Sequence, residues 1–517
     1  MITFLIGIAI LVVGGSFYGR FCEKVFQPDD RKTPAYAKND GVDYVPMPKW
    51  KNSLINLLNI AGTGPILGPI QGVLFGPIAL ITIPIGCVIG GAMHDFFCGM
   101  ICIRDGGTQM PDMIGKYTNK HIYRLYTIFV SIVLFLVGVV FIYTPGDIAA
   151  TQVFGYGGTP QEASTWVIYS VIFVYYLIAT IFPIDKIIGK IYPIFGAILL
   201  LSAVGIFVML LTKGVNIPEI WKPWVAGGFD FGAYFKSGFF IPNFFVTVAC
   251  GILSGFHSTQ TALISRTIKS EREGRATFYN MMLTEGFIAL VWAAATLVMI
   301  SIGAEHAGIT MQMTDAGWGY FMQGADGLQQ ISATSVVGVI CRNMLGPIGG
   351  AFALVGVIVL PITSGDTALR AFRLMLADIF KLKLETPIKR ILFAVPIFAI
   401  VYICLILAKM NAAGFNVIWR YFGWSNQTMA IFALSCIVIY LMGVGKKKFI
   451  WMPMIPLVFY SFVTTSYIFS TQVGFALPMP VAYTIGAVFT LVVVVATIIR
   501  GSKGNEACAA GEVAEEN

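Results

Sequence analysis

The sequence has few charged residues, and almost no long charged stretch lies between residues 53 and 500. Only 12% of its 517 residues are Asp, Glu, Lys or Arg, whereas soluble domains use about 25%. A soluble protein of this length needs long, charged amphipathic segments, so that class is excluded. The net charge of +8 is spread over short loops, an arrangement that argues against a nucleic-acid partner.

Motifs of catalysis and metal binding are also missing. The chain has no G-x-x-x-x-G-K-[ST] phosphate loop and no H-E-x-x-H, so ATP-driven pumping and zinc proteolysis are not expected. Its nine cysteines show no disulfide framework and no metal-ligand spacing. We therefore expect no enzyme activity, no bound metal and no cofactor.

Apolar segments long enough to cross a membrane dominate instead. At 1.5 Å per residue, about 20 apolar residues cross the roughly 30 Å hydrocarbon core of a bilayer. Thirteen such spans are predicted, at Ile2–Tyr18, Ser53–Leu74, Pro77–Ile103, Leu125–Tyr143, Trp166–Phe182, Ile191–Leu211, Phe240–Ile264, Ala276–Ile302, Gly349–Phe380, Ile391–Leu407, Phe415–Leu441, Ile450–Phe469 and Pro480–Ile499. The sequence thus predicts an all-α, multi-pass protein of the lipid membrane.

The positive charges predict the orientation of these spans. The first span lacks a preceding positive residue and a cleavage pattern, so we expect it to be retained with its start outside. With that start, 28 of the 34 Lys and Arg residues fall in cytoplasmic segments, as the bias of membrane proteins requires. The carboxyl terminus is then cytoplasmic.

Ten of the spans form two halves of five, which places the halves in opposite orientations. The predicted divisions are an N-terminal helix with its loop (1–52), the first repeat (53–212), an extracytoplasmic connection (213–239), the second repeat (240–444), two accessory helices (445–500) and a disordered acidic tail (501–517). Inverted repeats of this kind are typical of secondary transporters.

The first span of each half is interrupted by glycine near its middle, in "NIAGTGPILGP" and in "ACGILSGFHSTQTALISR". Irregular backbone survives at this depth only against protein or a water-filled cavity, and paired interruptions indicate a transporter binding site. Pro65 and Pro69 can each restart a helix, whose N-terminal dipole suits a carboxylate. The alternative is that these glycines only allow a kink or close helix packing.

Polar side chains gather at the middle depth of the spans, where ionisable groups are costly and serve function. This central layer holds Asn59, Thr63, His257, Ser258, Thr259, Gln260, Glu285, Thr363, Ser364, Asp366, Thr367, Ser425, Asn426 and Gln427. His94 and Asp95 lie nearer the cytoplasm and can instead pair with Arg104. His257 and Glu285 can equally be hydrogen-bonded packing groups.

Longer stretches resemble one known family. "NIAGTGPILGP", "SGFHSTQTALISR", "EGRATFYNMMLTEGFIALVWAA", "TSGDTALRAFRLMLAD" and "RYFGWSNQTMA" resemble the carbon starvation protein A family, in that order and over nearly the whole chain. "HDFFCGM" followed by "RDGGTQMPDMIGKY" is similar to the family's segment after the first broken helix. The resemblance implies a proton-driven transporter of peptides or pyruvate in the cell inner membrane, induced during carbon starvation. Larger members carry more chain at the C-terminal end, which leaves the substrate range open.

That family is similar to the LeuT-type transporters, which implies a LeuT-like 5+5 inverted repeat with one extra N-terminal and two extra C-terminal helices. In those proteins a cation lies between the unwound first core helix and a hydroxyl pair on the eighth. The resemblance therefore implies a sodium site at Ala61, Gly62, Thr363 and Ser364. Proton coupling is equally consistent with the residues Asp366, Glu285, His257 and Lys190, with His94 and Asp95 as further relay groups.

We expect an anionic substrate to bind between the two broken helices, with a co-ion near Asp366. The expected substrate contacts are Thr63, Gly64, His257, Ser258, Gln260, Asn426 and Gln427. Rival classes are a sodium-coupled symporter of another small organic nutrient, a channel and a membrane sensor. The loops at 19–52 and 303–348 are too small for a signalling domain, and the oligomeric state stays open.

Overall fold

The computed structural model describes residues 1–41, 44–179, 184–222, 240–314, 317–324, 327–380, 382, 387–411 and 414–503. This part of the chain contains ten helices that are long and apolar enough to cross a membrane, and one further pair that is bent by 45°. A shorter apolar helix covers Ala163–Ala179. A mostly helical, multi-pass architecture is confirmed, whereas the count of thirteen spans and their 5+5 arrangement stay predictions. The predicted tail and most of the 213–239 connection lie outside the described residues.

The helices before residue 213 cover the predicted N-terminal helix and first repeat. They are α1 (Ile2–Ala9), η1 (Ile10–Gly14), α2 (Gly15–Phe26), α3 (Pro34–Ala37), α4 (Lys49–Ala61), α5 (Gly64–Gly72), η2 (Val73–Phe75), α6 (Ala79–Gly86), η3 (Cys87–Gly91), α7 (Ala92–Arg104), α8 (Met110–Tyr117), α9 (Lys120–Ile148), η4 (Ala149–Val153), α10 (Ala163–Ala179) and α11 (Ile184–Thr212).

The remaining elements cover the predicted second repeat and the two C-terminal helices. They are α13 (Phe240–Thr247), α14 (Ala249–Ile252), α15 (Phe256–Ser265), η5 (Glu271–Glu273), η6 (Arg275–Tyr279), α16 (Asn280–Ile302), η7 (Ala304–His306), β1 (Thr310–Thr314), β2 (Gly317–Gly324), β3 (Gly327–Ile331), α17 (Ala333–Ile379), α18 (Pro387–Met410), α19 (Gly414–Gly443), η8 (Lys447–Phe449), α20 (Trp451–Ser470) and α21 (Met479–Ser502).

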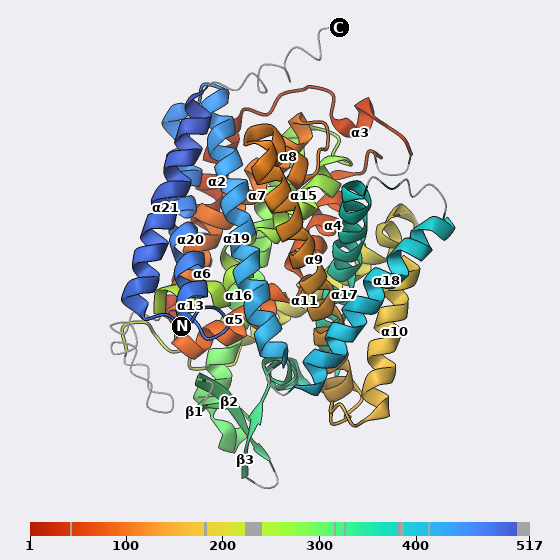
Figure 1. The fold of residues 1–517 in the computed structure, drawn as a ribbon. Coiled ribbons are helices and arrows are strands. Elements are labelled where there is room, and N and C mark those ends of the chain that lie inside the picture. Colours follow the sequence, from red (N-terminus) through yellow and green to blue (C-terminus); the bar gives the residue numbers. More distant parts are fainter. Residues whose placement is uncertain are drawn as a thin grey trace.

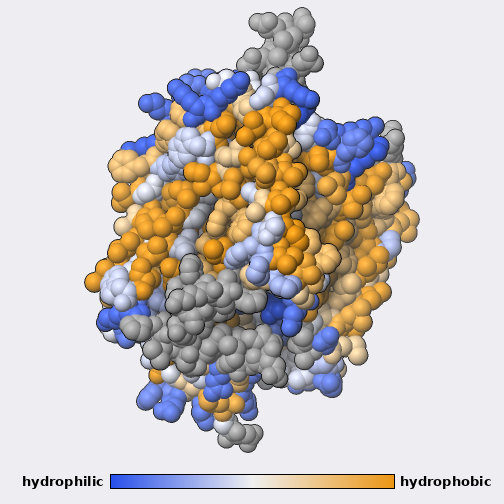
Figure 2. All heavy atoms as spheres, turned by 60° about the vertical axis from the view of Figure 1, so that its left-hand side comes forward, coloured by the Kyte–Doolittle hydropathy of each residue, from blue (hydrophilic) through white to orange (hydrophobic). Residues whose placement is uncertain are grey.

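The outer surface carries a broad apolar band. Figure 2 shows hydrophobic side chains over the middle of the molecule and hydrophilic residues gathered toward its two ends. Lipid-facing helices expose large apolar residues, such as Leu201 (71%), Leu392 (70%) and Ile348 (78%). Such a surface is stable only in lipid, which agrees with a membrane protein.

A small β-sheet lies where the sequence predicted only a loop, between residues 303 and 348. Strands β1, β2 and β3 pair antiparallel in that order, and Figure 1 shows them at the opposite end of the molecule from the end of α21. The following helix, α17, begins at Ala333 and bends at Gly346, which has a φ of +69°. Pro347 then starts its second part, because proline is favoured in the first turn of a helix. The predicted span that begins at Gly349 therefore matches the start of this second part, and the first part of α17 was not predicted.

Residues 27–41 and 44–48 form a strap between α2 and α4, across one end of the bundle. The hydroxyl of Thr33 donates to the carbonyl of Ile268 (2.7 Å), and the N–H of Met47 donates to the carbonyl of Thr267 (2.9 Å). Asn52, at the start of α4, donates to the same carbonyl of Thr267 (3.0 Å). The strap therefore holds the segment that follows α15 close to the start of α4.

A buried ion pair connects this strap to three helices. Arg104, the last residue of α7, donates to both oxygens of Glu271 at 3.0 Å each, and the Glu271 side chain is 0% exposed. The same guanidinium donates to the hydroxyl of Tyr440 on α19 (3.0 Å) and to the carbonyl of Gln27 (2.9 Å). It also lies 4.2 Å from the centroid of the Phe26 ring. One arginine thus joins α2, α7, η5 and α19.

Loss of the Glu271 carboxylate is expected to destabilise the fold strongly. Glu271→Ala leaves Arg104 partly buried without its carboxylate, a change that costs about 3–5 kcal/mol when a buried pair is broken. We expect a clear fall in the melting temperature of the protein in detergent. Arg272→Ala is the matched control, because its pair with Asp30 is exposed (63% and 77%) and such pairs contribute about 1 kcal/mol or less. Equal melting temperatures for both variants would contradict this account.

Candidate functional site

The first broken helix is interrupted where the sequence predicted. α4 ends at Ala61, and Gly62 has a φ of +25° and a ψ of −149°, a conformation open mainly to glycine. A Cβ atom on Gly62 would lie 2.8 Å from the Phe141 ring. Helix α5 then begins at Gly64 with Pro65 in its first turn. The Thr63 hydroxyl at this break is buried and has no hydrogen-bond partner among the described residues.

The second broken helix packs against the first at this point. α14 ends at Ile252, Leu253 is extended, and α15 begins at Phe256. A Cβ atom on Gly64 would overlap the side chain of Cys250, and one on Gly68 would lie 3.2 Å from the carbonyl of Thr247. The two interruptions that the sequence paired therefore lie side by side. The glycines also allow the two helices to pack closely, which is the alternative role predicted for them.

Asn426 of α19 caps the N-terminus of α15. Its side-chain oxygen accepts from the N–H of Phe256 (2.7 Å) and from the hydroxyl of Ser254 (3.0 Å), while its backbone carbonyl accepts from the N–H of Gly255 (3.0 Å). Its amide group donates to the sulfur of Cys250 (3.1 Å). The end of α15 that was expected to face a substrate carboxylate is thus satisfied within the protein in this conformation.

Four ionisable side chains form a buried chain beside the second break, which we call the imidazole–carboxylate cluster: His94, Asp95, His257 and Glu285. Asp95 on α7 lies between the two histidines, with His94 Nδ1 and His257 Nδ1 each 2.8 Å from one of its oxygens. On the other side of His257, Nε2 lies 3.3 Å from Oε2 of Glu285 on α16. All four side chains are at most 1% exposed.

The imidazole–carboxylate cluster keeps unused hydrogen-bonding capacity. Within the described part of the chain, Nε2 of both histidines and both oxygens of Glu285 lack a hydrogen-bond partner, because the 3.3 Å approach to Glu285 does not have hydrogen-bond geometry. Buried polar groups are rarely left unpaired, and those that are call for a functional explanation. These atoms can hold or pass a proton.

The predicted pairing of Asp95 and His94 with Arg104 is wrong. The structure pairs Arg104 with Glu271, and it pairs Asp95 with the two histidines. The reason is helix geometry: Asp95 is more than two turns from Arg104 on the same helix, whereas His257 approaches it from α15.

One member of the hydroxyl pair of α17 contacts the first broken helix directly. Ser364 donates to the carbonyl of Leu58 (2.8 Å), next to the predicted cation positions Ala61 and Gly62. Thr363 donates to Leu360 within its own helix (2.8 Å). The elements of the implied sodium site are therefore adjacent.

The other predicted residues divide into two groups. Ser258 bonds to the carbonyl of Gly255 (2.6 Å), while Gln260 and Gln427 are buried, and each has a side-chain oxygen without a partner in the described chain. Asp366 lies in a different place, 3.7 Å from Arg370 on the same helix, and no described ion pair links it to His257. Lys190 is in α11, but its side chain lies outside the described part of the structure.

Sequence reasoning missed a second buried ion pair, at the opposite end of the bundle from Arg104. Lys409 of α18 donates to Asp147 of α9 (2.8 Å), which also accepts from Thr334 (2.7 Å). The ammonium group lies 4.9 Å from the Tyr143 ring centroid. The available signal was an ionisable residue at the end of an apolar run, but no pattern in the sequence pairs residues 262 positions apart. Over the described residues, no group of three His, Cys, Asp or Glu could hold a metal ion.

The sequence matches the family described as "Carbon starvation protein CstA" over residues 1–150, 148–318 and 318–467. An "uncharacterized membrane protein" of Haemophilus influenzae is 41% identical over 338 residues, covering 57% of this chain and 91% of the relative. Proteins named "Peptide transporter CstA" are 24% identical in Campylobacter jejuni (87% of this chain, 77% of the relative) and in Escherichia coli K12 (87% and 78%).

Solved transporter structures share the fold. A manganese transporter of Eremococcus coleocola has a TM-score of 0.57 at 11% identity and covers 90% of this chain and 99% of its own. MhsT in complex with L-phenylalanine has a TM-score of 0.56 at 11% identity (87% and 99%). A Na⁺-coupled sialic acid symporter has a TM-score of 0.52 at 14% identity (96% and 97%). At these identities the likeness shows that the chain shares the fold of these structures, and it shows nothing about the substrate.

Tight contact between the two broken helices is expected to depend on Gly64. Gly64→Ala places a Cβ atom on the Cys250 side chain, and overpacking of this kind costs about 1–3 kcal/mol. We expect a lower melting temperature and a lower yield of monodisperse protein in size-exclusion chromatography.

The double variant Gly64→Ala/Cys250→Gly removes the obstructing side chain and should recover most of the loss. Gly14→Ala is the control, because its Cβ atom would meet Ile10 at an ordinary 3.9 Å. Failure of the double variant to improve on Gly64→Ala would show that the Cys250 contact is not the cause.

Proposed function

Because the chain belongs to the carbon starvation protein CstA family, it is a membrane transporter, and we propose that it imports small carboxylate nutrients, peptides or pyruvate, by proton-coupled secondary transport. The relatives named peptide transporters support the substrate class. Two broken helices that pack against each other support a binding site between them. We place the protein in the cell inner membrane, with the N-terminus outside and the C-terminus in the cytoplasm.

The observation that carries proton coupling is the imidazole–carboxylate cluster. Two carboxylates and two imidazoles are shielded from solvent on α7, α15 and α16, so each change of charge there alters a large electrostatic energy. Histidine changes charge near physiological pH. Uptake of one proton by Glu285 removes a buried charge directly beside His257, which lies in the first turn of α15. Protonation is thereby linked to the conformation of the second broken helix.

The substrate carboxylate can be recognised at both breaks. At the first break, Thr63 offers an unpaired hydroxyl at the N-terminus of α5, where the helix dipole favours an anion. At the second, the carboxylate would take the place of the Asn426 side chain, which already presents an oxygen to the N–H of Phe256. Gln260 and Gln427 already donate an amide hydrogen each, to the Thr259 hydroxyl and to the Phe245 carbonyl, and their side-chain oxygens without a partner in the described chain can accept from an N–H of a peptide.

Alternating access requires that contacts at the two ends of the bundle open in turn. At the end that carries Arg104, its bond to Tyr440 connects α7 to α19. At the end that carries the sheet, the hydroxyl of Tyr320 on β2 donates to the carbonyl of Ile70 on α5. We propose that the Arg104 contact opens toward the cytoplasm and the Tyr320 contact opens toward the outside.

Sodium coupling is a second candidate, favoured by the bond from Ser364 to the Leu58 carbonyl. A cation there would replace the hydroxyl hydrogen as the partner of that carbonyl. Ser364→Ala is expected to leave uptake driven by a pH gradient close to the wild-type level under the proton proposal. Loss of uptake that depends on sodium, measured in proteoliposomes with only a sodium gradient, would favour the second candidate.

Transport in proteoliposomes tests the proton proposal. We expect labelled pyruvate or a labelled dipeptide to accumulate in response to an inward proton gradient. Glu285→Gln keeps the size of the side chain but cannot take up the proton, so accumulation should be lost while exchange of labelled for unlabelled substrate persists. His257→Ala should also lose accumulation, whereas Glu305→Gln, exposed beyond the end of α16, should not.

Accumulation by Glu285→Gln at the wild-type level would remove the cluster from coupling. Uptake that responds to neither a proton nor a sodium gradient would contradict coupled transport altogether. Asp366→Asn, whose carboxyl lies beside Arg370, tests the other predicted coupling residue in the same assay.

A further inference from the structure

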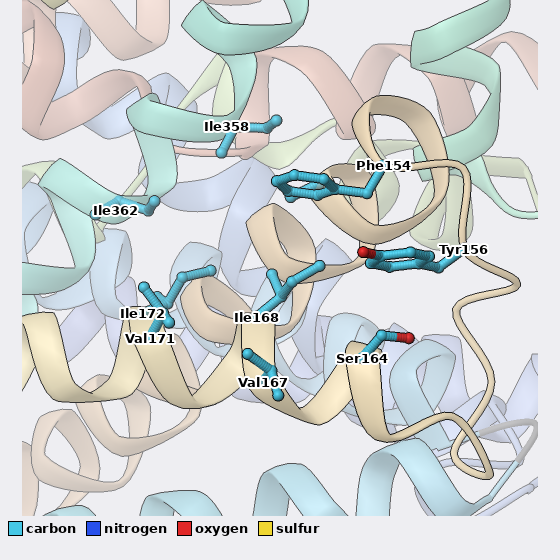
Figure 3. Close-up of a pocket in the computed structure, with 10 residues that line it drawn as sticks. Phe154, Tyr156, Ser164, Val167, Ile168, Val171, Ile172, Ile358 and Ile362 are labelled. Carbon is cyan, nitrogen blue, oxygen red and sulfur yellow. The ribbon is translucent and has the colours of Figure 1, made fainter.

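A cavity of about 520 Å³ lies between α10 and α17, beside η4 and the loop that follows η4 (Figure 3). Its volume is within the roughly 300–1,000 Å³ range of small-molecule sites. Two of the residues that line it, Val167 and Val171, are 61% and 65% exposed. Both belong to α10, an apolar helix, so the cavity opens on the face that meets lipid rather than on the path between the broken helices.

The lining changes in polarity from one end of the cavity to the other. Figure 3 shows the hydroxyl groups of Tyr156 and Ser164 at one end and the side chains of Ile172 and Ile362 at the other. Tyr156 stacks on Phe154, with ring centroids 5.8 Å apart and planes inclined by 12°. Aromatic residues of this kind are enriched at the level of lipid headgroups. The polar end is therefore the end nearer the membrane surface.

Water is a poor occupant for most of this space. An ordered buried water needs two to four polar partners, and the deep end is lined by aliphatic side chains. Apolar surface left in contact with water costs about 25 cal/mol per Å². In a bilayer the neighbouring hydrocarbon removes that cost.

We propose that this cavity binds one acyl chain of a membrane phospholipid, from the leaflet nearer the β1–β3 sheet. The chain enters past Val167 and Val171 and extends toward Ile358 and Ile362, while the glycerol and headgroup region lies near the hydroxyls of Tyr156 and Ser164. The bound chain fills the space between α10 and α17. Ile362 is two residues before Ser364, which bonds to the first broken helix, so the lipid supports the helix that contacts the transport site. The proposal does not depend on the substrate or on the coupling ion.

Photo-crosslinking tests this site in the full chain. The protein is reconstituted in nanodiscs that contain a phosphatidylethanolamine with a diazirine in one acyl chain, irradiated, and digested for mass spectrometry. We expect labelled peptides from residues 164–172 and 355–362 above the general labelling of the lipid-facing residues of α18. Val171→Trp fills the mouth of the cavity and should reduce this labelling to the general level.

Val174→Trp is the matched control, because Val174 is also on α10, is 48% exposed and does not line the cavity. It should label as the wild type does. Melting temperature after removal of lipid gives an independent measure: added phospholipid should restore the wild type and Val174→Trp more than Val171→Trp. Uniform labelling that Val171→Trp does not change would overturn the proposal. Displacement of the label by excess free fatty acid, but not by phospholipid, would also overturn it.

Discussion

The structure depends on the satisfaction of backbone polar groups where helices are broken inside the membrane. An unpaired N–H or carbonyl in lipid costs several kcal/mol, so each break needs partners from neighbouring helices. Asn426 supplies them at the second break, and Ser364 bonds to a carbonyl just before the first. These partners come from α19 and α17, which explains why helices far apart in the sequence surround the two helix breaks. The site therefore exists only as a product of the assembled bundle.

Buried ionisable side chains also need partners, and they differ in how fully they are paired. Near the helix breaks, Asp95 has two imidazoles beside it. Glu285 is approached only by His257 and has no hydrogen bond among the described residues. At the ends of the bundle, Arg104 and Lys409 are paired closely with Glu271 and Asp147. The fully paired groups hold the ends together, and the partly paired ones lie where a change of protonation affects the broken helix. The charged groups at the ends of the bundle are therefore structural, and those of the imidazole–carboxylate cluster are the candidates for coupling.

Local patterns predicted most of the architecture. Apolar length identified the membrane class, and Gly62, Gly64 and Pro65 marked a real break, because backbone preferences act over a few residues. Contacts between distant segments were harder to predict: the sequence left Arg104 open as an alternative partner of Asp95, and no spacing in it links Asn426 to the N-terminus of α15. The β1–β3 sheet was missed because its short strands follow no long alternating pattern. The 5+5 arrangement and the roles of the site residues remain predictions.

The strap between α2 and α4 restricts how far the two broken helices can move apart. It ties the segment after α15 to the start of α4, so the ends of both broken helices are attached to one peptide. These ends cannot separate widely without breaking the bonds at Thr267 and Ile268, and they are constrained to move together. The strap therefore couples the motion of the two broken helices, so that they move as one unit.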